Sequence, residues 1–271
     1  MDQKRIIDEF KELVSIEVHS RDERAIADVL KEKLTALGLT VTEDKAGEVL
    51  GGNTGNLYAQ LPGSTDGEPV LFSAHMDRVG NHGHIVPLVK EEEGKIVSDG
   101  TSILAGDDIG GVAAILAMLR EVKEKQIPHG PIEVAFSVCE ETGVEGSRQY
   151  DFSKFRSKSA FVYDASGKAG TIVLAAPSKG RVTIRVHGVT AHAGNEPEKG
   201  LNALKVAADL IMQLPDGRLS PVSTANFSII EAGSATNVVC DLVTITGEQR
   251  SRDAKEYQQI SADIQAAADR I

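Results

Sequence analysis

The stretch LFSAHMD, residues 71–77, decides how the rest of the chain is interpreted. It predicts a buried strand over 70–74 that ends in His75-Met76-Asp77. Because side chains alternate along a strand, His75 and Asp77 leave it on the same side. The imidazole of His75 can then bind a metal ion while Asp77 orients the ring from behind. Since H-x-D also occurs at ordinary strand ends, the metal interpretation depends on residues further along the chain.

The composition is that of a globular protein with one large or two smaller domains, because the chain has 271 residues and is 41% hydrophobic. A formal net charge of -11, from 29 basic and 40 acidic side chains, argues against nucleic acid or a membrane surface as the main partner. Cys139 and Cys240 have no cysteine nearby in the sequence, which indicates reduced thiols and a cytoplasmic protein. We find neither a secretory signal nor a run as long as a membrane span.

Up to residue 177, helical and apolar strand patterns alternate. The second predicted helix should be capped by Ser20 and Asp22 and end at Gly38. Continuous apolar strands between helices are typical of an α/β domain with a mostly parallel sheet and helices on both faces. Helices are predicted over 6–18, 23–37 and 112–125, strands over 39–43, 56–61, 70–74, 132–138 and 160–163, and a surface hairpin over 82–98.

The pattern changes after Pro177, and we place a domain boundary there, with domains at 1–177 and 178–271. Residues 181–187 alternate between polar and apolar side chains, as expected of a strand with one solvent-exposed face. A helix over 201–214, strands over 222–230 and 238–246, and a helix from Asp253 come next. This order predicts a smaller α+β sandwich that lacks its last strand.

Acidic side chains gather at the ends of four segments of the first domain. In an open α/β sheet, ligands bind at the carboxyl ends of the strands, so we expect these side chains to meet at one edge. Such carboxylates would repel one another without a cation, and one His among them suits zinc, cobalt or manganese. The four segments supply His75 with Asp77, Asp107 with Asp108, Glu140 with Glu141, and Asp164.

Each segment also has a plainer explanation. An Asp-Asp pair at a helix start usually caps the helix and complements its dipole. Two Glu residues after a strand usually form a solvated turn. The coincidence of all four segments favours a site for two divalent ions. Within that site, one of Glu140 and Glu141 would bind metal and the other would take a proton from water.

The order of these motifs resembles the co-catalytic dinuclear zinc peptidases of the peptidase T, aminoacylase and carboxypeptidase G family. SDGTSILAGDD at 98–108 is most similar to peptidase T-like members, and GVTAHAGNEPEKGLNAL at 188–204 resembles the dimerisation domain of the family. The ordered set covers most of the chain. Its members are HMD at 75–77, GDDIGG at 106–111, EETGVEGS at 140–147 and YDASG at 163–167.

The resemblance implies a dinuclear metal site in the first domain. By similarity, His75 and Asp164 would hold one ion, Asp107 would bridge the two ions, and Glu141 would hold the second. Glu140 would be the general base. The ions would be zinc, with cobalt or manganese as alternatives.

The resemblance also implies residues that act around the metal site. Asp77 would orient the ring of His75. His192 would come from the small domain, often across a dimer, to stabilise the tetrahedral oxyanion. Arg250 resembles a clamp for the substrate carboxylate, although it could equally be a surface strand residue. Asn237 resembles a lid residue that reaches the substrate.

Two features depart from the family pattern. Ile109 stands where the family commonly has a Lys, which concerns the substrate class more than the metal site. The family also supplies one more His ligand from a segment after the small domain, and this sequence stops at Ile271. We therefore expect a C-terminally truncated member whose second metal is one ligand short, which could leave the chain inactive by itself.

The predicted function is metal-dependent hydrolysis of short peptides from the N-terminus, as in a tripeptide aminopeptidase, by a cytoplasmic homodimer that associates through the small domain. One alternative keeps the same site but hydrolyses N-acyl amino acids as a deacylase. A second alternative is a non-catalytic dimer that binds peptides or metal. The retained Glu140 argues against the second alternative, since such a protein needs no general base.

Overall fold

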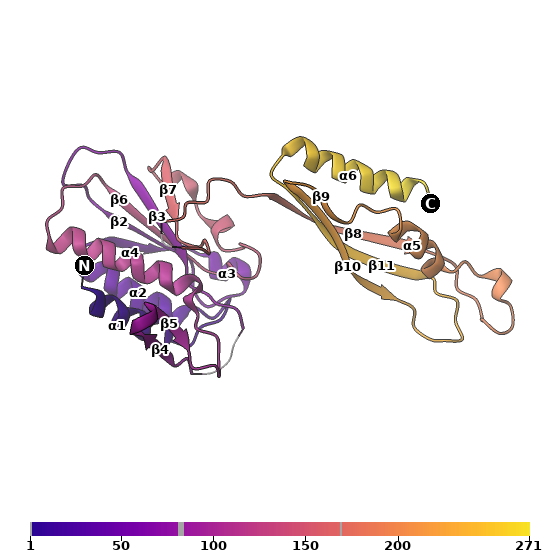
Figure 1. Ribbon diagram of the computed structural model, residues 1–271, viewed down its shortest axis with the longest axis horizontal. Coiled ribbons are helices and arrows are strands. Elements are labelled where there is room, and N and C mark those ends of the chain that lie inside the picture. Colours follow the sequence, from indigo (N-terminus) through magenta and orange to yellow (C-terminus); the bar gives the residue numbers. More distant parts are fainter. Residues whose placement is uncertain (1, 81–83, 169) are drawn as a thin grey trace. The chain divides into compact units, whose positions relative to one another are not determined.

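The structure is a computed structural model that describes residues 2–80, 84–168 and 170–271. Its chain divides into two compact units, Met1–Ala169 and Gly170–Ile271 (Figure 1). The division falls eight residues before the boundary expected after Pro177. Residues 81–83, which include His82 of the expected hairpin, lie outside the described residues.

The first unit is built on a five-stranded sheet with the order β1-β2-β6-β3-β7. β3 runs parallel to β6 and β7, whereas β2 runs antiparallel to β1 and β6. The predicted α/β class is confirmed, with a sheet that is mixed because β2 runs opposite to the other four strands. The strands are β1 (Thr40–Glu43), β2 (Leu57–Leu61), β3 (Val70–His75), β6 (Ile132–Ser137) and β7 (Ser159–Val162).

Three long helices cover one face of this sheet. α1 (Gln3–Val14), α2 (Arg24–Ala36) and α4 (Gly106–Glu124) share a single buried cluster with alternate residues of β2 and β6, such as Leu57 and Phe136. The side chains on the other face of these two strands, such as those of Tyr58 and Glu133, contact the segment around Phe155 and Ser157. The unit also contains the short helix α3 (Ala46–Leu50) and a hairpin of β4 (Pro87–Lys90) and β5 (Lys95–Ser98).

The start of α2 differs from the sequence-based expectation. Its N-cap residue is Glu23, which makes no side-chain capping bond. Neither Ser20 nor Asp22 caps the helix, because the hydroxyl of Ser20 donates to Asp77 and Asp22 accepts a hydrogen bond from Asn53. The predicted end is confirmed, since Gly38 follows α2 with φ +98°, a conformation that glycine adopts without steric cost.

The second unit is a four-stranded antiparallel sheet with the order β8-β11-β10-β9. Two helices share its core, which includes Val243 and Ile245 of the sheet and Leu210 and Ile264 of the helices. β9 was not predicted, because its four residues lie in a turn-rich segment after Pro215. The elements are β8 (Ser178–His187), α5 (Ala203–Ile211), β9 (Gly217–Ser220), β10 (Ser223–Ala232), β11 (Leu242–Ser251) and α6 (Ala254–Asp269).

Within the described residues, none of the helices has both the length and the apolar character needed to cross a membrane.

Candidate metal centre

Parallel strands deliver most of the candidate ligands to one edge of the first sheet. β3 ends at His75, which is in register with Ser137 at the end of β6. The turn after β6 carries Glu140 and Glu141, and Asp164 follows β7 on the other side of β3. Parallel strands end at the same edge, and for this reason the three segments meet there.

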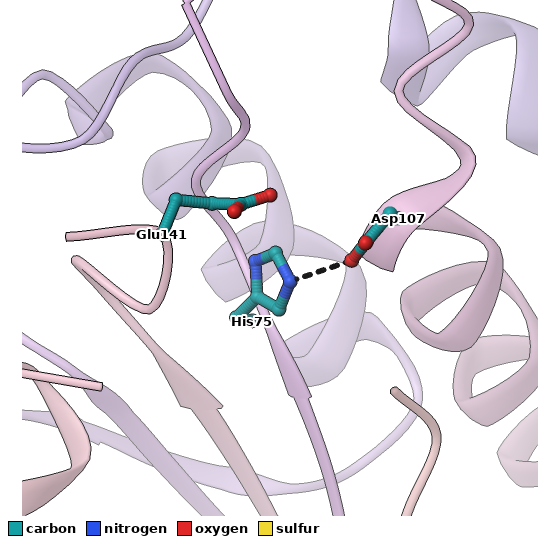
Figure 2. Close-up of side chains that lie close together, drawn as sticks. All are labelled: His75, Asp107 and Glu141. Carbon is teal, nitrogen blue, oxygen red and sulfur yellow. Dashed lines mark hydrogen bonds and ion pairs between the residues drawn. The ribbon is translucent and has the colours of Figure 1, made fainter. Parts of the chain in front are cut away.

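The fourth segment is the start of α4, which brings Asp107 to His75. Nε2 of His75 lies 2.9 Å from Oδ1 of Asp107, and Figure 2 shows Glu141 facing the same ring. The ring nitrogen is also 3.9 Å from Oε2 of Glu140 and 3.8 Å from Oδ1 of Asp164. The sequence-predicted metal residues therefore lie together around one imidazole.

Two overlapping groups of these side chains could hold a cation. Ligand atoms of His75, Asp107 and Glu141 all lie within 4.8 Å of one another, and the same is true of His75, Glu140 and Asp164. No third cluster of this kind occurs among the residues that the structure describes. His75 belongs to both groups and is only 2% exposed, so the buried ring is the centre of the arrangement.

Asp77 has two tasks in this structure. Nδ1 of His75 lies 2.9 Å from the main-chain oxygen of Asp77 and 3.4 Å from its carboxylate oxygen Oδ1, so the main-chain oxygen is the closer acceptor. The carboxylate of Asp77 accepts the backbone N–H groups of Glu140 at 2.9 Å and of Glu141 at 3.1 Å. Asp77 thus fixes the ring and also holds the turn that carries both glutamates.

Asp108 lies behind the site and is 2% exposed. Its Oδ2 accepts the backbone N–H of His75 at 3.2 Å, and the peptide bond between Asp107 and Asp108 is cis. A Cβ on Gly111 would lie 2.3 Å from Oδ1 of Asp108 and 2.7 Å from Cβ of Tyr163. Only glycine fits at position 111, since α4 must approach the site this closely. Ile109, which stands where the family commonly has a Lys, is buried in the core.

Burial and mutual repulsion raise the pKa values of three carboxyl groups in the cluster. Burial raises the pKa of Asp108 to about 8, and repulsion from Asp164 adds to the effect. Burial, with repulsion from Asp107 and Glu140, raises the pKa of Asp164 to about 6. Burial and the charge of Asp107 also raise the pKa of Glu141. Each shift opposes the charged form of a carboxyl group.

The negative charge around His75 changes its pKa in the direction opposite to what burial alone would cause. Burial acts to lower the pKa of His75, but the hydrogen bonds to Asp77 and Asp107 outweigh it and raise the pKa to about 10. A field that favours a positive charge at this ring also favours a cation beside Nε2, the ring nitrogen that faces Asp107. An imidazole nitrogen among carboxylate oxygens is a donor set that divalent ions such as zinc accept, so the residues fit a metal.

Two residues of the site were missed at the sequence level. Ser20 donates to Oδ2 of Asp77 at 2.6 Å, and Glu23 accepts the backbone N–H of Cys139 at 3.0 Å. The sequence around them reads as an ordinary helix start, so no local signal marked them. A cavity of about 400 Å³ opens beside the site, between the start of α4 and residues 163–166.

The remaining predicted site residues lie in the second unit. His192 forms a bridge with Val238, and the backbone N–H of Ala193 donates to the carbonyl oxygen of Asn237 at 2.9 Å. His192 and Asn237 are therefore neighbours, beyond the His187 end of β8. Arg250 lies near the opposite end of β11, paired with Lys179 at the start of β8.

Comparisons with known proteins agree with this arrangement. The model of peptidase family M28 matches residues 56–194, and the peptidase dimerisation domain matches residues 177–271. Among curated proteins, the uncharacterized protein YqjE of Bacillus subtilis is 38% identical over 99% of this chain and 73% of its own length.

Two solved structures have the same fold over 98% of this chain and 71% of their own. The aminopeptidase PepT of Bacillus cereus is 41% identical with a TM-score of 0.91, and a tripeptidase of Staphylococcus aureus is 34% identical with a TM-score of 0.93. The chain spans smaller shares of other curated relatives, such as 40% of peptidase T from Staphylococcus carnosus.

The fold and the comparisons thus define a peptidase, and its family implies the use of divalent metal ions. The chain belongs to the peptidase T-like family of zinc peptidases.

Proposed function

We propose that this protein is a dinuclear metallo-aminopeptidase that removes residues from the N-terminus of short peptides such as tripeptides. The observation that carries the proposal is the meeting of His75, Asp107 and Asp164 with the Glu140-Glu141 pair at one sheet edge. The names of the two similar structures, an aminopeptidase and a tripeptidase, support the substrate class.

In this proposal His75 and Asp164 would hold one ion, Glu141 would hold the second, and Asp107 would be shared by both, with zinc preferred over cobalt or manganese. The distances around Nε2 of His75 support this set. Bound ions would supply Lewis acidity to the attacking water and to the scissile carbonyl. The buried Asp77 behind the ring keeps the nitrogen that faces the site in place.

Glu140 is the proposed general base. Its carboxylate takes a proton from the attacking water and passes it to the nitrogen of the leaving amine. The backbone N–H of Glu140 donates to Asp77, and this hydrogen bond fixes the position of the Glu140 backbone from which the side chain extends. The position of Glu140 beside Nε2 of His75, at 3.9 Å, supports a role next to the ions.

His192 is the proposed donor to the oxyanion. Its Nδ1 accepts the backbone N–H groups of Gly194 at 3.1 Å and Asn195 at 3.2 Å. Because Nδ1 accepts, the proton of the neutral ring is on Nε2, so the exposed nitrogen is a hydrogen-bond donor. This tautomer is the one that a developing oxyanion requires.

Asn237 and Arg250 are the proposed substrate contacts. Leu242, five positions after Asn237, and Arg250 are eight positions apart along β11, which is roughly 26 Å at the rise per residue of a β-strand. One substrate cannot touch both ends of the sheet of one subunit. We therefore propose a cytoplasmic homodimer in which His192 and Asn237 serve the metal centre of the partner subunit, and the dimerisation-domain match supports this assembly.

The test compares three substrates with added zinc, cobalt or manganese: a tripeptide with a free N-terminus, the same tripeptide acetylated, and an N-acetyl amino acid. We expect release of the first residue from the free tripeptide, and loss of that activity with a chelator. Preference for the N-acetyl amino acid would replace the proposal by the deacylase alternative. If no substrate is cleaved while metal is bound, the non-catalytic alternative is favoured.

A further inference from the structure

Glu23 is a fully buried carboxylate behind the candidate metal centre. It stands at the start of α2 and is 0% exposed. Its Oε1 accepts two backbone N–H groups, those of Arg21 and Cys139, each at 3.0 Å. Its Oε2 is buried and has no hydrogen-bond partner among the described residues. A buried carboxylate with one unpartnered oxygen costs stability, so its position calls for an explanation.

The turn at residues 139–141 explains why Glu23 is buried at this position. Three successive backbone N–H groups point at two buried carboxylates: Cys139 donates to Glu23, and Glu140 and Glu141 donate to Asp77. Both acceptors are 0% exposed. The backbone that carries Glu140 and Glu141 is therefore fixed by hydrogen bonds from its N–H groups to Glu23 and Asp77.

The first residue of this turn needs such support. Cys139 has φ +51°, a left-handed conformation that is sterically unfavourable for a residue with a Cβ. Conformations of this kind persist where the surroundings hold them in place. Glu23 holds the N–H of Cys139, and the carbonyl of Cys139 accepts the N–H of Glu145 at 3.0 Å. The bond from Glu23 thus fixes the point at which the chain turns from β6 toward Glu140.

We propose that Glu23 is a positioning residue, whose Oε1 locks the backbone of Cys139 and thereby sets where Glu140 and Glu141 stand in the metal centre. The inference rests on the proposed function and adds a residue to it. Glu23 touches neither metal nor substrate. It acts through the turn, alongside Asp77 and Ser20.

Glu133 provides a matched control. It is 1% exposed and likewise accepts backbone N–H groups, those of Arg156 and Ser157. It belongs to the same sheet but lies at the start of β6, away from the turn that comes after the strand. Shortening this carboxylate should cost stability without moving the metal ligands.

The experiment measures cobalt affinity by calorimetry, amide hydrogen exchange at residues 139–141, and thermal stability for three variants of the full chain. Glu23→Asp keeps the charge but moves the carboxylate oxygen away from the N–H of Cys139. We expect cobalt affinity to fall about 10- to 100-fold, the range for residues that support metal ligands. We also expect faster amide hydrogen exchange at residues 139–141. Glu23→Gln keeps Oε1, so affinity should stay within about threefold. Glu133→Asp should lose thermal stability and keep its affinity.

The proposal is overturned if Glu23→Asp binds cobalt like the wild type, if Glu133→Asp weakens cobalt binding equally, or if Glu23→Gln loses as much affinity as Glu23→Asp. Should Glu23→Asp fail to fold, Glu23→Gln decides the question, because the proposal requires wild-type affinity and slow exchange of the turn. A wild-type chain that binds no cobalt would overturn the proposed function itself. A wild-type chain that binds cobalt without cleaving peptides would leave the test of Glu23 intact.

Discussion

The two units place their polar residues in opposite ways. In the first unit, four separate segments bring their acidic side chains and His75 to one edge of a sheet, within 4.8 Å in each candidate group. In the second unit, His192 and Asn237 lie beyond one end of the sheet and Arg250 lies near the other. The difference arises from strand direction, because parallel strands end at one edge while antiparallel neighbours end at opposite edges.

This comparison separates residues that should govern metal binding from residues that should affect only the reaction. If it is correct, variants in the first unit lose metal or chemistry, and variants in the second unit keep metal and lose activity to a smaller degree.

The largest effect is expected from Glu140→Gln. The variant removes the proposed proton carrier but keeps the backbone N–H that donates to Asp77. Turnover of a tripeptide should fall by about 10²–10⁴-fold, the range for a lost general base, while cobalt affinity stays within about threefold. Steady-state kinetics and calorimetry on the same sample measure both. Unchanged turnover would remove Glu140 from the mechanism.

His75→Ala should have the next largest effect. The ring belongs to both candidate groups. Loss of a residue that only supports a metal ligand lowers metal affinity about 10- to 100-fold, and loss of a ligand itself should have a larger effect. We therefore expect His75→Ala to weaken metal affinity by at least about 100-fold. Calorimetric titration with zinc measures the loss. His187→Ala, at an exposed position at the end of β8, is the control and should bind zinc like the wild type. Full zinc affinity in His75→Ala would refute the ligand role of His75.

His192→Ala should have a moderate effect that is confined to the reaction. The ring is exposed and its Nδ1 accepts a backbone N–H group, so the variant would remove the proposed Nε2 donor to the oxyanion and should lower kcat by about 10²-fold. Zinc affinity and thermal stability should remain those of the wild type, because His192 lies outside both candidate groups. Equal losses of zinc affinity and kcat would contradict the division of roles between the units.

Arg250→Ala should have the smallest effect. Arg250 forms an ion pair with Glu248 at 2.6 Å on the exposed surface, so the variant should change thermal stability very little. If Arg250 holds the substrate carboxylate, KM should rise by about tenfold with kcat nearly unchanged, since one charge-assisted hydrogen bond contributes about 1.5–3 kcal/mol. Glu248→Gln is the control for loss of the ion pair alone. The clamp is rejected if KM does not change.

The sequence was sufficient to predict that several side chains of the candidate metal centre meet, because they come directly after apolar strands, and a strand pattern also predicts where the strand ends. His75, Glu141 and Asp164 could be placed in this way, and the structure brings them together. The fold class was predicted for the same reason. The reversed direction of β2 was not, since an apolar strand does not reveal the direction of its neighbour.

Residues that act through the backbone were missed. The sequence predicts Ser20 as a capping residue and Glu23 as the first residue of a helix. In the structure, Ser20 contacts a carboxylate and Glu23 contacts a turn, and both partners lie far from them in the sequence. The hydrogen bonds that the Asp77 carboxylate accepts from the backbone of Glu140 and Glu141 were missed for the same reason, because these N–H groups lie more than 60 residues away in the sequence. Such contacts depend on packing between segments, which local patterns do not encode.

The central claim is that the cluster around His75 is a metal centre. The most direct measurement is an anomalous difference map at the zinc absorption edge, from crystals of the chain grown with zinc. We expect a peak about 2.0–2.1 Å from Nε2 of His75, the usual zinc–nitrogen distance, with carboxylate oxygens of Asp107 or Asp164 completing its coordination. A map with zinc bound elsewhere and none at His75 would contradict it.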